Sequence, residues 1–179
     1  MSSIYKWYFH HSESKNGKLV ETANETLAAI RAAAANDCGL LVFVGKPGCS
    51  TCAKGWSSQY MDAEGKLLAY MEKNRIVGLK IDDSQGHVQS IGNGLGSYKN
   101  HDKSKATNKS VPYLILVKPK AKASATSVSF SPSANIAAFF GGHGGGISDM
   151  AYTKVKAWLD KMLDPALAYY DGRANYAAT

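Results

Sequence analysis

The stretch that decides the fold is Leu40–Cys52, which reads LLVFVGKPGCSTC. Its first part, Leu40–Val44, is a continuous apolar run of the length expected for a central strand covered on both faces. Gly45–Gly48 predicts a turn, and the C-x-x-C pair of Cys49 and Cys52 follows at once. Helical spacing then resumes, so the sequence places two cysteines where a buried strand turns into a helix.

Other apolar segments on both sides of this stretch predict the remaining elements. The expected strands are Ile4–Phe9, Ile76–Ile81 and Tyr113–Val117, with Thr126–Phe130 and Ile136–Phe140 as candidates to pair with the last. The expected helices are one capped by Asn24 and stopped by Gly39, one through Leu67 and Met71, and one capped by Ser148 that runs to Leu163. Helical crossovers imply parallel pairing in the first half of the chain, and closely spaced later strands imply antiparallel pairing.

Length and composition indicate one ordinary α/β domain. The chain has 179 residues, 45% of them hydrophobic and 20% charged. We expect a single domain over residues 1–164, in which residues 1–23 form an N-terminal strand and extension, followed by a tail over residues 165–179. The longest apolar run is far below the ~20 residues that a membrane span needs. The N-terminus shows no signal-peptide pattern, so we expect a soluble protein that is cytoplasmic or a processed exported form.

The cysteine count favours a redox dithiol over the other common uses of cysteine. Three cysteines in this length cannot make a disulfide framework, and Cys38 is the spare thiol. A structural zinc site would need a second C-x-x-C or an H-x-x-x-H pair. Neither is present, and the histidines are scattered at His10, His11, His87, His101 and His143. We therefore expect no metal and no bound cofactor.

The position of the pair predicts its chemistry. Unpaired N–H groups and the positive end of the dipole at a helix N-terminus favour a thiolate over a thiol. Two intervening residues keep the second sulfur within bonding reach of the first. We expect Cys49 to be the exposed attacking thiol and Cys52 the more buried thiol that resolves the mixed disulfide. Cys38, at a predicted helix end, is expected to be a buried and inert thiol.

From about Thr26 to Leu163 the chain resembles the thioredoxin superfamily, with thioredoxin-like disulfide reductases the closest in pattern. The resemblance rests on LLVFV before GCSTC, the strand ending Ile81-Asp82, the step Val111-Pro112-Tyr113, and Trp158-Leu159 in the closing helix. It implies a thioredoxin fold, a mixed central sheet flanked by helices, with a long lysine-rich loop before a cis proline. It also implies that Pro112 faces the dithiol and that the backbone of Val111 meets an extended substrate.

The chain departs from thioredoxins proper around the dithiol. Gly48 stands where they have tryptophan, Ser50-Thr51 where they have Gly-Pro, and Phe43 where they have a buried acid. Together with Val111, Pro112 and His143, the residues Gly48, Ser50 and Thr51 are the expected substrate-binding set. The lost carboxylate removes the usual proton acceptor for the resolving thiol. This argues against an ordinary thioredoxin, while thiol exchange itself is still expected.

Two functional hypotheses follow. The first is a thiol–disulfide oxidoreductase that acts on protein or peptide disulfides and is recycled by a redox partner, with no nucleic acid as a partner. The second is a non-catalytic module of the same fold that binds a metal or a partner through Cys49, Cys52 and His143. Seven lysines against one aspartate lie between Lys99 and Lys122. This window is either a solvated loop or a patch that selects acidic substrates.

Overall fold

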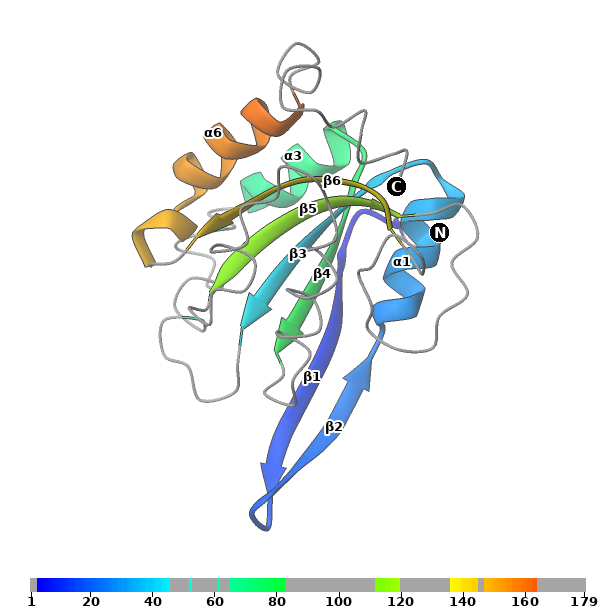
Figure 1. Ribbon diagram of the computed structural model, residues 1–179, viewed down its shortest axis with the longest axis vertical. Coiled ribbons are helices and arrows are strands. Elements are labelled where there is room, and N and C mark those ends of the chain that lie inside the picture. Colours follow the sequence, from blue (N-terminus) through cyan, green and yellow to red (C-terminus); the bar gives the residue numbers. More distant parts are fainter. Residues whose placement is uncertain are drawn as a thin grey trace.

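The computed structural model describes residues 3–45, 52, 61, 65–82, 112–119, 136–144 and 147–163. In chain order its elements are β1 Trp7–Lys15, β2 Lys18–Asn24, α1 Thr26–Ala35, β3 Gly39–Gly45, α3 Lys66–Lys73, β4 Ile76–Asp82, β5 Tyr113–Pro119, β6 Ile136–Gly144, the short 3-10 helix η2 Ile147–Met150 and α6 Tyr152–Leu163. Figure 1 shows these elements arranged around one twisted sheet.

The described residues form a sheet of six strands in the order β2-β1-β4-β3-β5-β6. β4 lies between β1 and β3 and is parallel to both. β5 pairs antiparallel with β3, β6 pairs antiparallel with β5, and β2 pairs antiparallel with β1. The fold class is therefore α/β with a mixed sheet, and the expected change from parallel to antiparallel pairing is confirmed.

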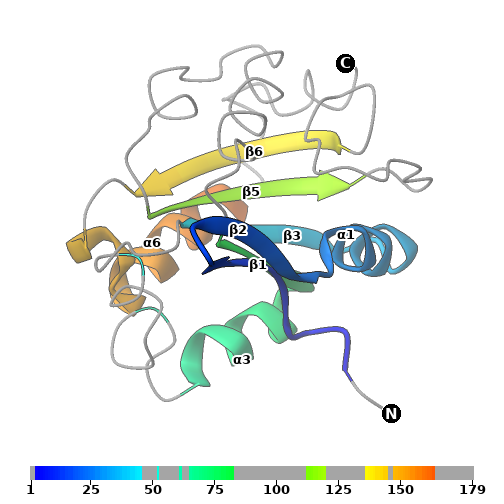
Figure 2. The same cartoon turned by 90° about the horizontal axis from the view of Figure 1, so that it is seen from below.

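Helices cover both faces of the sheet, and β3 contributes to both cores. Leu40, Val42 and Val44 belong to a cluster that includes residues of α1, while Leu41 and Phe43 belong to a cluster with residues of α3 and α6. All five side chains are fully buried. Alternate side chains of a strand point to opposite faces, so a strand covered on both sides must be apolar throughout. The unbroken LLVFV run follows from this. Figure 2 shows α1, α3 and α6 around the sheet from a second direction.

The strands predicted at Leu40–Val44, Ile76–Ile81, Tyr113–Val117 and Ile136–Phe140 are confirmed as β3, β4, β5 and β6, and the helix through Leu67 and Met71 as α3. The candidate strand Thr126–Phe130 lies outside the described residues.

Three predicted helix boundaries are wrong. The N-cap of α1 is Glu25 and makes no side-chain cap hydrogen bond, so Asn24, the last residue of β2, does not cap it. α1 ends at Ala35 with Asn36 as its C-cap, and the left-handed residue that follows is Asp37 (φ 54°), two positions before the predicted stop at Gly39. Ser148 lies inside η2 rather than at the start of α6, because a 3-10 turn precedes that helix.

The N-terminus also differs from the prediction. Instead of one strand at Ile4–Phe9, the chain forms a hairpin of β1 and β2 around Asn16-Gly17. Both turn residues have positive φ, 51° for Asn16 and 74° for Gly17. This is the requirement of a type I′ turn, whose twist matches that of the two strands, and Asn-Gly is its preferred sequence. The hairpin adds β2 as an edge strand to a five-stranded core.

Gly78 of β4 is a tight point of the packing, and it gives a test of the fold. A Cβ placed on it would lie 2.6 Å from the Trp7 ring and 2.9 Å from the Met71 Cε atom. We expect Gly78→Ala to lower the free energy of unfolding by about 1–3 kcal/mol through overpacking, measured by urea denaturation. Gly39→Ala is the matched control, because its new Cβ would meet nothing closer than 3.7 Å. Equal unfolding midpoints for the two variants would contradict this packing.

Candidate active site

Cys52 lies at the carboxyl end of the central strand β3. Its side chain is only 5% exposed and it is disulfide-bonded. It packs directly on Gly45, the last residue of β3: a Cβ placed there would be 3.2 Å from Cys52 Cβ and 3.4 Å from its Sγ. The missing side chain of Gly45 thus lets this sulfur approach the end of the sheet. Gly48, Cys49, Ser50 and Thr51 lie outside the described residues.

Two further predicted site residues reach the same end of the sheet. Pro112 is buried and immediately precedes β5, whose first residue, Tyr113, pairs with Val44 of β3. On the other side of β5, His143 of β6 pairs with Leu114. The fold therefore brings Cys52, Pro112 and His143 from three separate parts of the chain to the same end of the sheet. Val111 lies outside the described residues, and the cis bond to Pro112 stays a prediction.

The glycine-rich stretch GGHGGG, Gly141–Gly146, predicts a loop from the sequence, but the structure places His143 in a strand. β6 continues to Gly144, and the His143 side chain is half-buried. Its Nε2 atom lies 2.6 Å from the carbonyl oxygen of Asp149, and its ring stacks on Trp158 of α6 with 5.2 Å between centroids. A carbonyl oxygen can only accept, so Nε2 carries the proton and donates it. In the neutral ring Nδ1 is then the acceptor, and the stacking fixes its orientation.

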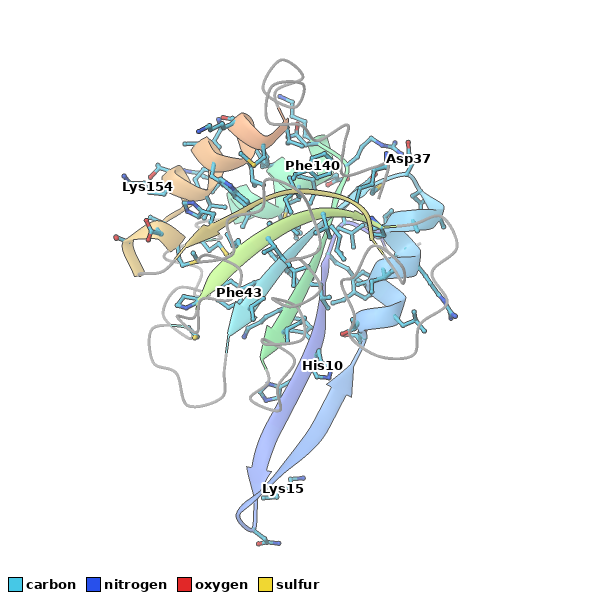
Figure 3. The ribbon with its side chains drawn as sticks, in the orientation of Figure 1. His10, Lys15, Asp37, Phe43, Phe140 and Lys154 are labelled. Atoms are coloured by element: carbon cyan, nitrogen blue, oxygen red, sulfur yellow. The ribbon has the colours of Figure 1, made fainter. Side chains whose placement is uncertain are left out.

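Phe43 occupies the position where the resemblance would place a buried acid, and it is fully buried. The Phe43 ring packs against Gly45 on the side where Cys52 lies: its Cε1 atom would be 3.3 Å from a Cβ placed on Gly45. Phe43 pairs with Leu114, which in turn pairs with His143. The Phe43 side chain beside Cys52 is therefore apolar. In the row of paired residues Phe43, Leu114 and His143, which crosses β3, β5 and β6, the histidine is the residue with an ionisable side chain. Figure 3 shows Phe43 among the side chains of this end of β3.

The spare thiol, Cys38, lies at the other end of β3. It is 1% exposed and free, and its Sγ contacts the Asn36 carbonyl oxygen at 3.4 Å and the Tyr5 hydroxyl at 3.8 Å. The hydrogen bond to Cys38 raises the pKa of Tyr5. Seven residues of strand, roughly 20 Å, separate this end of β3 from Gly45. The prediction of a buried thiol is confirmed.

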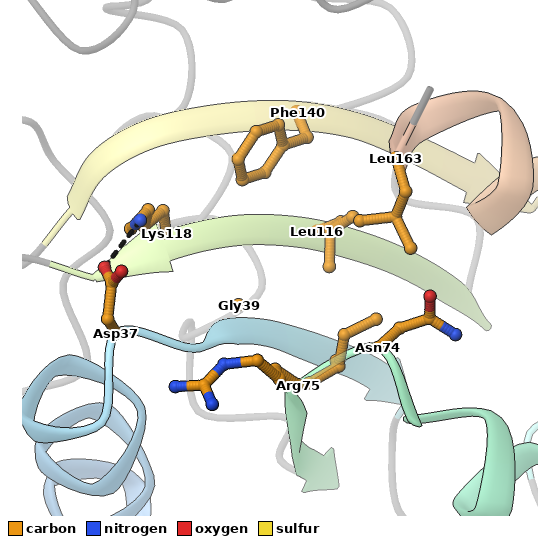
Figure 4. A pocket seen from close by; sticks show the side chains of 9 residues that line it. Asp37, Gly39, Asn74, Arg75, Leu116, Lys118, Phe140 and Leu163 are labelled. Carbon is orange, nitrogen blue, oxygen red and sulfur yellow. Dashed lines mark ion pairs between the residues drawn. The ribbon is translucent and has the colours of Figure 1, made fainter. Parts of the chain in front are cut away.

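A hollow of about 320 Å³ also lies at this far end, between the start of β3 and the end of β5. Figure 4 shows its charged side, where Lys118 and Asp37 form an ion pair of 2.7 Å, and its apolar side with Phe140 and Leu163. The hydrogen bond from Lys118 lowers the pKa of Asp37. Lys118 therefore lies at the end of β5 away from Pro112, and it does not belong to a basic patch beside the dithiol. The lysines of Lys99–Lys109 lie outside the described residues.

The described part of the chain also bears on metal binding and on membrane insertion. Over those residues, no three His, Cys, Asp or Glu side chains gather where they could hold a metal ion. Over the same residues, no helix is long and apolar enough to cross a membrane. Cys49 lies outside the described residues, so this finding does not extend to the set of Cys49, Cys52 and His143.

Burial predicts how the three thiols differ in the reduced protein. Iodoacetamide near neutral pH should label Cys49 first, with Cys52 and Cys38 at least about tenfold slower, since a 5% or 1% exposed sulfur is shielded from the reagent. Peptide mass spectrometry over time gives the three rates. In urea the rates should converge. Equal rates in the folded protein would contradict the assignment of Cys49 as the attacking thiol.

Comparison with known proteins adds no assignment to this geometry. No family model, no curated protein and no solved structure matches the chain.

Proposed function

We propose that the chain is a thiol–disulfide oxidoreductase of the thioredoxin fold that acts on protein or peptide disulfides through Cys49 and Cys52. The observation that carries the proposal is the disulfide at Cys52, seated on Gly45 at the carboxyl end of the central parallel strand. Because Cys38 is free, Cys49 is the remaining cysteine of the chain that can be its partner. A C-x-x-C pair beside a βαβ unit is the usual setting of this chemistry.

The order of the elements supports the same proposal. β3, α3 and β4 follow one another along the chain as a βαβ unit of two adjacent parallel strands, with the C-x-x-C segment after β3. Ligands of open α/β sheets bind beyond the carboxyl ends of the parallel strands. Gly45 and Asp82 end β3 and β4 at this end of the sheet, where Pro112 directly precedes β5.

The exchange proceeds in two steps. The Cys49 thiolate attacks one sulfur of the substrate disulfide; the substrate S–S bond breaks, a mixed disulfide forms, and the released substrate thiolate takes a proton from water. The deprotonated Cys52 sulfur then attacks Cys49. This step frees the second substrate thiol and forms the Cys49–Cys52 disulfide. The substrate gains two electrons, and an external dithiol partner returns them to the protein. In the reverse direction the same steps oxidise a substrate dithiol.

Substrate selection by charge is a separate part of the proposal. Lys99, Lys103, Lys105 and Lys109 precede Pro112 in the chain and outnumber Asp102. They can raise the local concentration of acidic disulfide peptides at this edge, an effect that salt screens over about 8–10 Å. The alternative function, metal or partner binding through Cys49, Cys52 and His143, requires free thiolates. It predicts stoichiometric metal after purification together with no disulfide reductase activity.

Two serine variants test the mechanism. Cys52→Ser should trap mixed disulfides on Cys49, because the resolving sulfur is gone, and Cys49→Ser should abolish exchange with insulin or a small disulfide. Non-reducing mass spectrometry and a turbidity assay measure the two effects.

Cys38→Ser is the matched control, because this thiol lies at the far end of β3. The variant should keep the exchange rate within about twofold of the parent. Full reductase activity of Cys49→Ser would overturn the proposed function.

A further inference from the structure

The β1–β2 hairpin extends beyond the sheet as an arm, which we define as Ser12–Glu21. Pairing of β1 with β4 ends at His11 and Asp82, but pairing with β2 continues to Lys15 and Lys18. The last four residues of β1 therefore project past the sheet, by about 13 Å at the usual strand rise. Figures 1 and 3 show the projection, with Lys15 labelled at its tip.

The arm has a defined shape at both of its ends. At its root the register shifts between His11 and Ser12, so that Thr22 is an extra residue of β2. Such a bulge bends a strand pair and increases its twist. At its tip the positive φ angles of Asn16 and Gly17 fix a tight turn and with it the register. These two features hold the arm as a ribbon in one direction.

The arm leaves the sheet at the carboxyl ends of its parallel strands, which is the end where Cys52 lies. Gly45 of β3 pairs with Asp82 of β4, and Asp82 pairs with His11 of β1, so the three residues form one row across the sheet. Two strand spacings, about 10 Å, separate His11 at the root of the arm from Gly45 under Cys52. A small disulfide can reach this end of the sheet without extending to the arm, whereas the surface of a protein that covers this end is wider than the ~10 Å that separate Gly45 from the root of the arm.

We infer that the arm is a docking element for protein partners of the Cys49–Cys52 dithiol, and this inference rests on the proposed function. The partner is a polypeptide that carries the reacting disulfide and lies along the arm while its sulfur reaches Cys49. β2 is the terminal strand of the sheet that the described residues form, and the backbone of an edge strand can add a strand of another chain. The arm contains Glu13 and Glu21 against Lys15 and Lys18, so its contribution should depend little on salt, unlike that of the lysine window.

A shortened arm tests the inference. Deleting residues 12–14 and 19–21 removes three paired positions and keeps Lys15-Asn16-Gly17-Lys18 as the turn. We expect kcat/KM for insulin to fall at least about tenfold, because contacts with the protein partner are lost. For hydroxyethyl disulfide we expect kcat/KM within about twofold of the parent, because the dithiol is untouched. The ratio of the two values should be the same at low and high salt.

A point variant guards against misfolding of the deletion. Gly17→Val places a β-branched residue at φ 74°, where no atom of the described residues lies within 4 Å of the new Cβ, so the variant strains the turn without a clash against them. It should lower the insulin value at least about threefold and spare the small disulfide. Equal loss on both substrates, or loss on neither, would overturn the docking role. A parent protein inactive even on hydroxyethyl disulfide would instead overturn the proposed function.

Discussion

The fold depends on the burial of β3 on both faces. Its side chains divide between the core under α1 and the core under α3 and α6, so both helical layers are attached to this one strand. β4 and β5 pair with its two edges, and their inner residues are just as deeply buried. A polar residue in LLVFV would have to lose its hydration in one of the two cores. A residue without an apolar side chain is tolerated only at the end of the strand, where Gly45 makes room for Cys52.

The central elements could be predicted from the sequence because their patterns are strong. β3, β4 and β5 are short, nearly continuous apolar runs, and α3 and α6 carry apolar residues at helical spacing. The hairpin was missed because KLVETAN mixes charges with apolar residues and does not show the alternation of a half-buried strand. The signal that could have found it was Asn16-Gly17, the commonest sequence of a two-residue hairpin turn.

The candidate site was predictable in its residues but only partly in its arrangement. The sequence places the C-x-x-C pair directly after one predicted strand and Pro112 directly before another. Because these two strands pair antiparallel, Cys52 and Pro112 lie at the same end of the sheet. The glycines around His143 predict a loop because they lower strand propensity, yet the residue lies in β6. Its pairing with Leu114 and its stacking on Trp158 are tertiary contacts, which no local pattern encodes.

The core layer on the side of Cys52 is rich in methionine. Of the chain's five methionines, Met61, Met71 and Met150 are fully buried in it and Met162 is partly buried against it. Unbranched thioethers repack easily, so this layer can adjust to small changes in the side chains around it. The same sulfurs form sulfoxides, and Met162 is the most accessible of the four, with its Sδ packed on the bare backbone of Gly141. An added oxygen there would push α6 away from β6, so strong oxidants would damage this domain through its thioethers as well as through its thiols.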